Sequence, residues 1–282
     1  MPQSQIVLPA GATPVQFIMQ QLPPGGVALT SIASYPLFDP TAASYGWWDD
    51  KSPEAASAAS QLDHRQIVGA AFADYLATVY ILERAPIDPP VTLARGFIFR
   101  HGTKLYGALG PSYSLNAAAD LTAKSVGKWA IVLRDANGQQ LARYAFTPRL
   151  RDIVAFAYRV VDNAEASTLE LVGPSGVADA KNLSEAPPTL RIVWPQDGGV
   201  VRGMAGTVHV SWLAQAETGK RILASVFYSA DGGKHFKPEA FEKQLSALDI
   251  RINPNASDHI VKVVVTDGSR SSVAQSTFSL SS

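Results

Sequence analysis

The stretch KWAIVLRDANGQQLARYAF, residues 128–146, holds two short apolar runs separated by Asp-Ala-Asn-Gly. Trp129, Ile131 and Leu133 fall on one face of the first run, and a turn through 135–138 would fold the second run back beside it. The pattern predicts a β-hairpin. Similar runs surround it, and no helix-length periodicity interrupts residues 89–177. We therefore expect a β-sandwich domain over residues 85–180.

A second group of strand-like runs follows residues 178–188, whose small polar residues and closing Pro-Pro are typical of a domain boundary. Asp-Gly pairs at 197–198, 231–232 and 267–268 separate these runs. Six or seven strands in a segment of this length fit an immunoglobulin-like sandwich of ~100 residues. We expect that sandwich over residues 187–282. Because the chain has no cysteine, Trp212 and Tyr228 are expected to anchor its core without a disulfide.

Residues 1–84 differ from the rest and predict a strand-and-loop segment with one helix. Ser52 and Pro53 suit an N-cap and a first helical position, and apolar residues at helical spacing follow them. We expect the helix near 53–77, giving way to extended chain over 78–82, where β-branched and aromatic residues gather. The predicted fold class is mainly β, with two sandwich domains and an N-terminal segment containing about one helix.

Composition excludes several classes of function. The 282 residues carry 24 basic and 24 acidic side chains, and a zero net charge does not favour nucleic acid as a partner. The absence of cysteine excludes disulfides and thiolate metal sites. No apolar run reaches the roughly 20 residues that span a membrane. No nucleotide motif or metal-ligand spacing appears, so we expect no cofactor, no metal and no catalytic residue, and the oligomeric state stays undecided.

Three C-terminal stretches carry a resemblance to known modules: residues 208–212 (VHVSW), 228–233 (YSADGG) and 263–268 (VVVTDG). With them, residues 187–282 resemble the immunoglobulin-like or fibronectin III-like modules of large bacterial surface and secreted proteins. Residues 127–146 resemble the β-module that precedes such a domain in exported zinc metalloproteases of the zincin type. The resemblance implies an extracellular or cell-surface location, although residues 1–9 do not look like a secretory signal.

The metalloprotease chemistry itself is not encoded in this chain. Zincins need His-Glu-x-x-His on a helix, because two imidazoles one turn apart bind zinc and the glutamate activates its water. The five histidines here are scattered and none forms that pattern. The resemblance therefore implies accessory modules without the protease's reaction, and the expected function is non-catalytic binding, adhesion or spacing.

One aromatic cluster is the candidate ligand-binding surface. Tyr45, Trp47, Trp48 and Asp49 could stack on a sugar ring and hydrogen-bond its hydroxyls, so a polysaccharide or a cell-surface protein is the expected partner. The competing interpretation is that these aromatic residues fill the core or an interface, since tryptophans are usually largely buried.

An enzymatic alternative uses the acidic residues of the same segment. A glycan-acting hydrolase would need two carboxyl groups facing each other about 5–9.5 Å apart. The candidates are Asp39, Asp49, Asp50, Glu54 and Asp63. Solvated loop charges explain the same residues equally simply.

Residues 229–236 (SADGGKHF) fit the S-x-D-x-G-x-x-[FW] pattern of the Asp-box turn of sialidase-type propellers. A propeller would repeat the motif once per blade, whereas this chain has it once. We therefore expect a structural turn in which the aspartate accepts backbone N–H bonds and glycine supplies positive φ.

Overall fold

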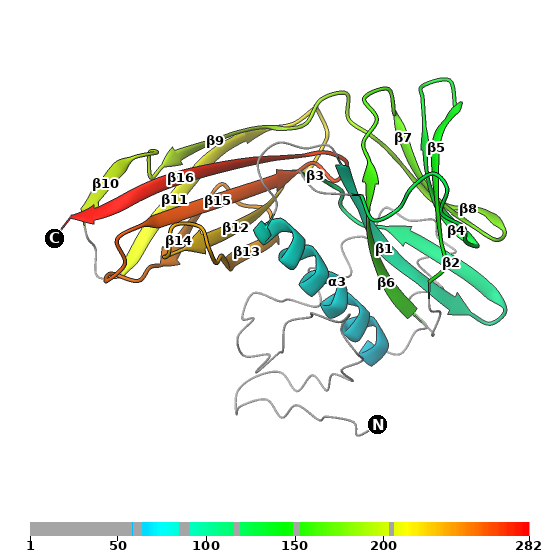
Figure 1. Ribbon diagram of the computed structural model, residues 1–282, viewed down its shortest axis with the longest axis horizontal. Helices are drawn as coiled ribbons and strands as arrows, with labels where there is room; N and C mark the ends of the chain where they lie inside the picture. Colours follow the sequence, from blue (N-terminus) through cyan, green and yellow to red (C-terminus); the bar gives the residue numbers. More distant parts are fainter. Residues whose placement is uncertain are drawn as a thin grey trace.

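The computed structural model describes residue 58 and residues 64–84, 91–115, 119–148, 153–202 and 206–281. Over these ranges the protein is mainly β, with mostly antiparallel sheets arranged as two sandwiches and a helix between them, as Figure 1 shows. The predicted fold class is confirmed. In the described part of the chain, no helix is both long and apolar enough to cross a membrane.

The first sandwich joins two four-stranded sheets. One sheet contains β1 (Val91–His101), β2 (Lys104–Leu109), β3 (Tyr113–Leu115) and β6 (Ile153–Val161). The other has the order β5-β4-β7-β8, with β4 Trp129–Arg134, β5 Gln140–Phe146, β7 Thr168–Gly173 and β8 Gly176–Asn182. The β4–β5 hairpin is confirmed, because Trp129 pairs with Phe146 and Arg134 with Gln140. Trp129, Ile131 and Leu133 point together into the core, as their spacing predicts.

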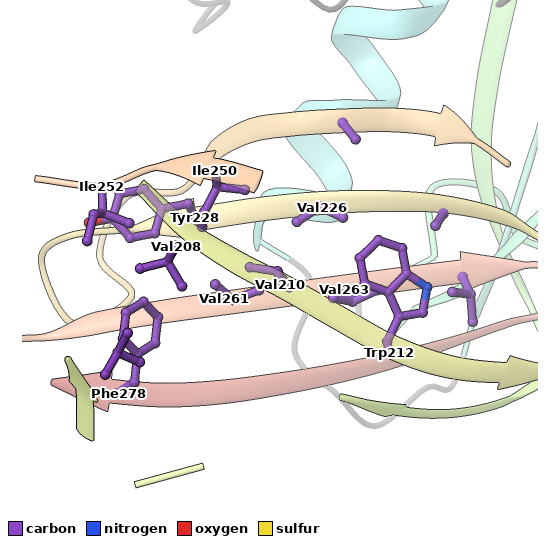
Figure 2. Packing of buried hydrophobic residues seen from close by; sticks show 14 residues of the cluster. Val208, Val210, Trp212, Val226, Tyr228, Ile250, Ile252, Val261, Val263 and Phe278 are labelled. Atoms are coloured by element: carbon purple, nitrogen blue, oxygen red, sulfur yellow. The ribbon is translucent and has the colours of Figure 1, made fainter. Parts of the chain in front are cut away.

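The second sandwich packs a three-stranded sheet against a five-stranded one. The smaller sheet has the order β14-β11-β9, with β9 Thr189–Trp194, β11 Thr207–Gln215 and β14 Ala247–Arg251. The larger has the order β10-β16-β15-β12-β13, with β10 Gly199–Arg202, β12 Leu223–Ser229, β13 Lys237–Lys243, β15 His259–Thr266 and β16 Ser271–Ser281. Alternate residues of these strands fill the core (Figure 2), and Trp212 and Tyr228 are buried there, as expected.

The helix α3 spans His64–Arg84, and its end corrects the sequence prediction. Thr78–Leu82, expected to be extended, is helical. Tyr75, Val79 and Leu82 lie at helical spacing and are all buried in one apolar cluster, so burial outweighs the β-propensity of this stretch. Residue 58 is also helical, and the rest of the expected range before residue 64 lies outside the described residues.

Helix α3 lies at the junction of the two sandwiches, as Figure 1 shows. Its apolar cluster includes Leu93 from β1, Tyr113 from β3, Phe227 from β12 and Val264 from β15. The two sheets therefore share one hydrophobic core across the helix. This position also explains why β1 is buried on both faces along nearly its whole length.

The first part of the segment between the sandwiches, predicted as a boundary over residues 178–188, is strand. Strand β8 continues to Asn182, two residues past the expected end of the first sandwich at residue 180. Leu183 then donates a backbone hydrogen bond to Ser167, and Ser184 is buried. Few residues are left to act as a free linker before β9 begins at Thr189.

Candidate functional site

The sequence candidates lie outside the described residues. This holds for the aromatic cluster Tyr45, Trp47, Trp48 and Asp49 and for the acidic residues Asp39, Asp50, Glu54 and Asp63. Both therefore stay predictions. The polar features that the structure does describe gather at the junction of the sandwiches.

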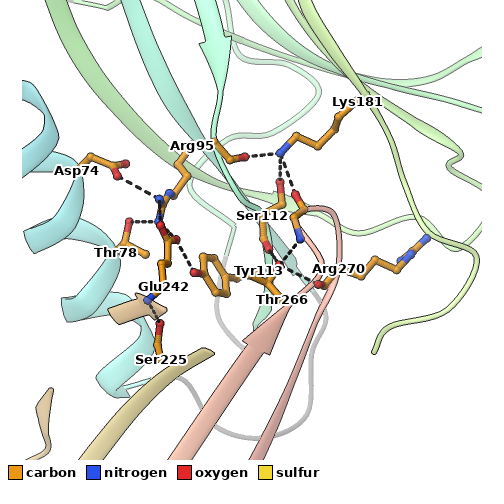
Figure 3. A network of polar contacts seen from close by, with 12 residues as sticks. Asp74, Thr78, Arg95, Ser112, Tyr113, Lys181, Ser225, Glu242, Thr266 and Arg270 are labelled. Carbon is orange, nitrogen blue, oxygen red and sulfur yellow. Dashed lines mark hydrogen bonds and ion pairs between the residues drawn. The ribbon is translucent and has the colours of Figure 1, made fainter. Parts of the chain in front are cut away.

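Four elements bring charged and phenolic groups together at that junction. Period-2 alternation along β1 turns Arg95 toward the helix, while Ala94 and Ile98 face the sandwich core. Asp74 and Thr78 lie one turn apart on α3, so both face Arg95. Figure 3 shows these groups converging with Tyr113 of β3 and Glu242 of β13. We call Asp74, Thr78, Arg95, Tyr113 and Glu242 the junction cluster.

The contacts of the junction cluster centre on the guanidinium of Arg95. Its Nη1 lies 2.8 Å from Glu242 Oε1 and donates to Thr78 Oγ1 at 3.1 Å. Its Nη2 lies 3.2 Å from Asp74 Oδ2 and donates to Glu242 Oε2 at 3.1 Å. Tyr113 donates its hydroxyl proton to Glu242 Oε1 at 2.5 Å. One arginine therefore holds two carboxyl groups from opposite sides of the junction.

The backbone at Glu242 is adapted to this contact. Among described non-glycine residues, Glu242 alone has a positive φ, at 48°. Its amide donates to Ser225 Oγ at 3.1 Å, and the β12–β13 register shifts nearby. A left-handed residue typically costs on the order of 1 kcal/mol or more. Strand β13 is therefore locally strained at Glu242, the residue whose carboxylate points into the junction.

Burial dominates the electrostatics of the cluster. The side chains of Arg95, Asp74 and Glu242 are 0%, 5% and 4% exposed. Burial raises the pKa of Asp74 to about 7, although Arg95 opposes this, and Asp74 Oδ1 has no hydrogen-bond partner. Burial also raises the pKa of Glu242, against the effects of Arg95 and the Tyr113 hydrogen bond. Burial thus favours the protonated form of both carboxyl groups, and a pKa of about 7 lets Asp74 gain or lose a proton near neutral pH.

A second contact places the β15–β16 turn against the first sandwich. Ser112 N donates to Gly268 O at 3.1 Å, and Thr266 Oγ1 donates to Ser112 O at 2.8 Å. The ammonium of Lys181 donates to Gly110 O and to Gly268 O, the latter at 3.0 Å (Figure 3). This turn is therefore held by backbone and side-chain groups of two neighbouring segments, the loop at Ser112 and strand β8.

The carboxylate of Asp267 organises the other side of that turn. It accepts hydrogen bonds from Ser184 Oγ, from the amide and hydroxyl of Ser269, and from the amide of Arg270. Burial alone would raise the pKa of Asp267, but these hydrogen bonds lower it. The connection between the sandwiches is thus tied to the turn at Ser184.

A third contact joins the end of α3 to β15. Lys262 is 2% exposed, and its Nζ donates to the carbonyls of Glu83 at 2.6 Å and Leu82 at 3.3 Å. Phe236 lies beneath the ammonium, 4.2 Å from ring centroid to Nζ. Burial lowers the pKa of Lys262 to about 8. The lysine thus satisfies helix carbonyls that have no partner within the helix.

This arrangement stabilises an interface. The charged groups of the junction cluster are almost fully closed to solvent, so a ligand of any size would have to separate the sandwiches to reach them. Among the described residues, no group of three His, Asp or Glu side chains could hold a metal ion. The buried ion pairs of the junction cluster thus join the two sandwiches non-covalently.

The Asp-box-like segment forms the expected structural turn. Asp231 Oδ1 accepts from the His235 amide at 3.0 Å, and Ser229 Oγ accepts from the Gly233 amide at 2.9 Å. Gly232 and Gly233 have φ values of 70° and 87°. Hydrogen bonds inside the loop thus account for the motif.

Sequence reasoning missed the junction cluster, although two of its members carry a signal. Arg95 is a lone charge in the apolar run 91–99, and Asp74 interrupts an apolar helical stretch. Buried charges of this kind require a partner. The partner Glu242 lies in the polar stretch KPEAFEK, which has weak strand character and was not predicted as a strand.

Comparison with known proteins gives weak structural matches only. No protein-family model matches the chain, and no curated protein does. The fibronectin(III)-like modules of Clostridium thermocellum CbhA align with 61% of this chain and 82% of theirs, at 10% identity and a TM-score of 0.26. An endo-β-1,4-mannanase from Thermotoga petrophila aligns at 12% identity and a TM-score of 0.27. An engineered protein aligns at 18% identity and a TM-score of 0.26.

The alignments cover modest shares of the chains. They include 34% of this chain for the mannanase and 39% for the engineered protein, which are 20% and 24% of those proteins' own lengths. At these TM-scores none of the three alignments adds to the fold described above.

Proposed function

We propose that this chain is a rigid, non-catalytic binding, adhesion or spacer module of an exported bacterial protein, and that it serves as the accessory region of a metalloprotease-like protein. The observation that carries the proposal is the buried contact of Arg95 with both Asp74 and Glu242, which ties the first sandwich and the helix to the second sandwich. A spacer or presenting scaffold requires such a fixed relation between its modules.

Rigidity follows from the way in which the contacts are distributed. The junction cluster, the β15–β16 turn and Lys262 join the sandwiches through different strands, and one apolar cluster runs between them. Domain pairs with small polar interfaces usually move relative to each other, whereas a large apolar interface restrains them. Loops at the ends of the sandwiches are then held in fixed positions and can present binding surfaces.

Export and the link to a metalloprotease rest on the sequence resemblance of residues 127–146 and 187–282. In this proposal the partner is a polysaccharide or a cell-surface protein at the extracellular face. The coding sequence immediately upstream tests whether the chain belongs to an exported metalloprotease-like protein. An in-frame segment with an export signal and a His-Glu-x-x-His motif would support it, and detection of the native protein only in the cytosol would contradict it.

Spin labels test the rigid arrangement directly. The chain has no cysteine, so Asn137→Cys in the β4–β5 turn and Asn255→Cys in the turn before β15 would carry the only two labels. We expect one narrow distance distribution by double electron–electron resonance. The same pair combined with Arg95→Ala and Lys262→Ala should broaden it, whereas Lys234→Ala on an exposed turn should not. A broad distribution in the otherwise unchanged protein would contradict the proposal.

A further inference from the structure

The second sandwich exposes an unusual concentration of apolar side chains. Seven large hydrophobic residues are prominently exposed in the described ranges, and four of them lie between residues 193 and 213. They are Val193 at 37%, Trp194 at 39%, Val200 at 57% and Leu213 at 57%. Trp194 on β9 and Leu213 on β11 belong to one sheet, whereas Val200 on β10 belongs to the other. Exposed apolar residues that share a face mark interaction surfaces.

The indole of Trp194 lies on the outer face of the sheet β14-β11-β9. Val208, Val210 and Trp212 of β11 are buried, so the alternate residue Ser211 faces outward. Trp194 pairs with Ser211 across the strands and shares its face. Ser211 pairs in turn with Ala247 of β14. The row beside the indole therefore consists of small side chains, and 39% of the tryptophan stays exposed.

Polar groups border this row on both sides. Two residues after Ser211 on β11, Leu213 pairs with Arg191 of β9. Two residues before Ser211, His209 pairs with Asp249 of β14. The His209 ring and the Asp249 carboxylate are 2.7 Å apart, with side chains 57% and 68% exposed. The face thus combines an aromatic plate with donors and acceptors of both charge signs.

The edge strand β9 is poorly suited to pair with another strand. Ser211 pairs with Trp194 and Trp212 pairs with Ile192, so Val193 is an extra, bulged residue. The strand is followed by Pro195, which has no N–H to donate. Bulges and prolines are the features by which edge strands avoid strand addition. The surface therefore favours a ligand that stacks on side chains over a chain that adds to the sheet.

We propose that the face formed by Trp194, Ser211, Leu213, Arg191 and the His209–Asp249 pair binds a neutral polysaccharide. The apolar face of a pyranose ring would stack on the indole, and its hydroxyls would exchange hydrogen bonds with the charged side chains. The mixed charge signs do not favour a polyanion. This assignment rests on the binding role proposed above and gives it a second site, separate from residues 45–49.

Affinity electrophoresis tests the site with soluble galactomannan, hydroxyethyl cellulose, xyloglucan and starch, and with polygalacturonate as the charged comparison. We expect at least one neutral polysaccharide to retard the protein. Trp194→Ala should weaken binding roughly tenfold, the usual scale of a lost aromatic stacking contact. Trp194→Phe should retain part of the retardation.

Ser211→Lys tests the same surface without altering the tryptophan. A long side chain at this position would cover the exposed part of the indole and should also weaken the retardation. The control is Val126→Ala, at an exposed apolar residue of the first sandwich, which should be retarded as the unchanged protein is. The double variant Trp47→Ala/Trp48→Ala removes the other candidate surface and shows how much of the retardation depends on it. Thermal unfolding of each variant confirms that it is folded.

Three outcomes would overturn the inference: no retardation by any neutral polysaccharide, equal retardation of Trp194→Ala, or loss of retardation in the Trp47/Trp48 variant alone. Self-association in sedimentation experiments that Trp194→Ala abolishes would assign the face to a second copy of the chain and overturn it too. The spin-label distances are independent of sugar binding. A narrow distribution without retardation would therefore reject this site and leave the rigid-module proposal standing.

Discussion

Lys262 on β15 donates a hydrogen bond to the main-chain carbonyl of Glu83, 2.6 Å away and 179 positions earlier in the chain. A buried side chain of the second sandwich thus caps the helix that packs on the first. Lysines that cap a helix C-terminus usually belong to the helix itself, whereas this one comes from another domain. The end of α3 is therefore coupled to the folding of the C-terminal sandwich.

Lys262→Met should lower the free energy of unfolding by about 1–3 kcal/mol, because the aliphatic stem is kept while two helix carbonyls lose their donor. Urea denaturation measures the change. Hydrogen exchange should report faster opening of the last turn of α3. Lys234→Met, at an exposed turn residue, is the matched control and should leave both unchanged. Equal stability of the two variants would mean that the cap does not hold the helix.

Arg95→Leu should destabilise the protein by about 3–5 kcal/mol, since it leaves the buried carboxyl groups of Asp74 and Glu242 without their cation. The control is Arg159→Leu, which removes an ion pair with Asp120 whose side chains are 32% and 31% exposed. An exposed pair of that kind contributes about 0–1 kcal/mol. Chemical denaturation of both variants gives the comparison, and a loss for Arg95→Leu no larger than that for Arg159→Leu would contradict the role of the cluster.

Asp74→Asn should remove one contribution to the pH dependence of stability. The pKa of Asp74 is about 7 in the folded protein against 3.8 ordinarily, so the folded state holds the proton more tightly. This contribution to stability is complete below about pH 4 and is lost as pH rises to about 7. Relative to the unchanged protein, Asp74→Asn should gain on the order of 2 kcal/mol between pH 5 and pH 8.5.

Guanidinium denaturation at the two pH values measures the gain of Asp74→Asn. Asp249→Asn is the control, because that carboxylate is exposed. A difference between Asp74→Asn and the unchanged protein that stays constant with pH would show that Asp74 does not titrate in this range.

His259→Phe should make the protein less sensitive to acid. The imidazole lies between Tyr228 and Phe278, with centroid distances of 6.0 Å and 5.0 Å, and burial lowers its pKa. Its contribution is complete above pH 6.5 and is lost as the pH falls below that value. At pH 8 the variant should lose about 1 kcal/mol, because the 2.8 Å contact with the Tyr228 hydroxyl is gone.

Melting temperatures between pH 4 and pH 8 check the effect of His259→Phe. The control His235→Phe alters an imidazole that is 88% exposed. We expect its melting curve to follow that of the unchanged protein across the range. A fall toward acid pH that is as steep in His259→Phe as in the unchanged protein would exclude the buried imidazole as the cause.

Local patterns in the sequence were enough for many of the strands and for the β4–β5 hairpin. Residues 128–146 form the predicted hairpin, and Trp212 and Tyr228 lie in the predicted core, because side-chain alternation and turn residues act over a few positions. The same reasoning failed where distant residues decide the outcome. Thr78 and Val79 favour a strand by themselves, yet both are buried in a helix packed between two sheets.

The sequence by itself determined a mainly β protein, two successive sets of strands and the turns within them. The tertiary structure decided how far the helix extends, that Glu242 meets an arginine 147 positions away, and that Trp194 is left open on a sheet of small neighbours. The physical reason is the distance along the chain over which each effect acts. Alternation and turn geometry are properties of adjacent residues, whereas burial and charge pairing depend on which surfaces meet after the strands have formed.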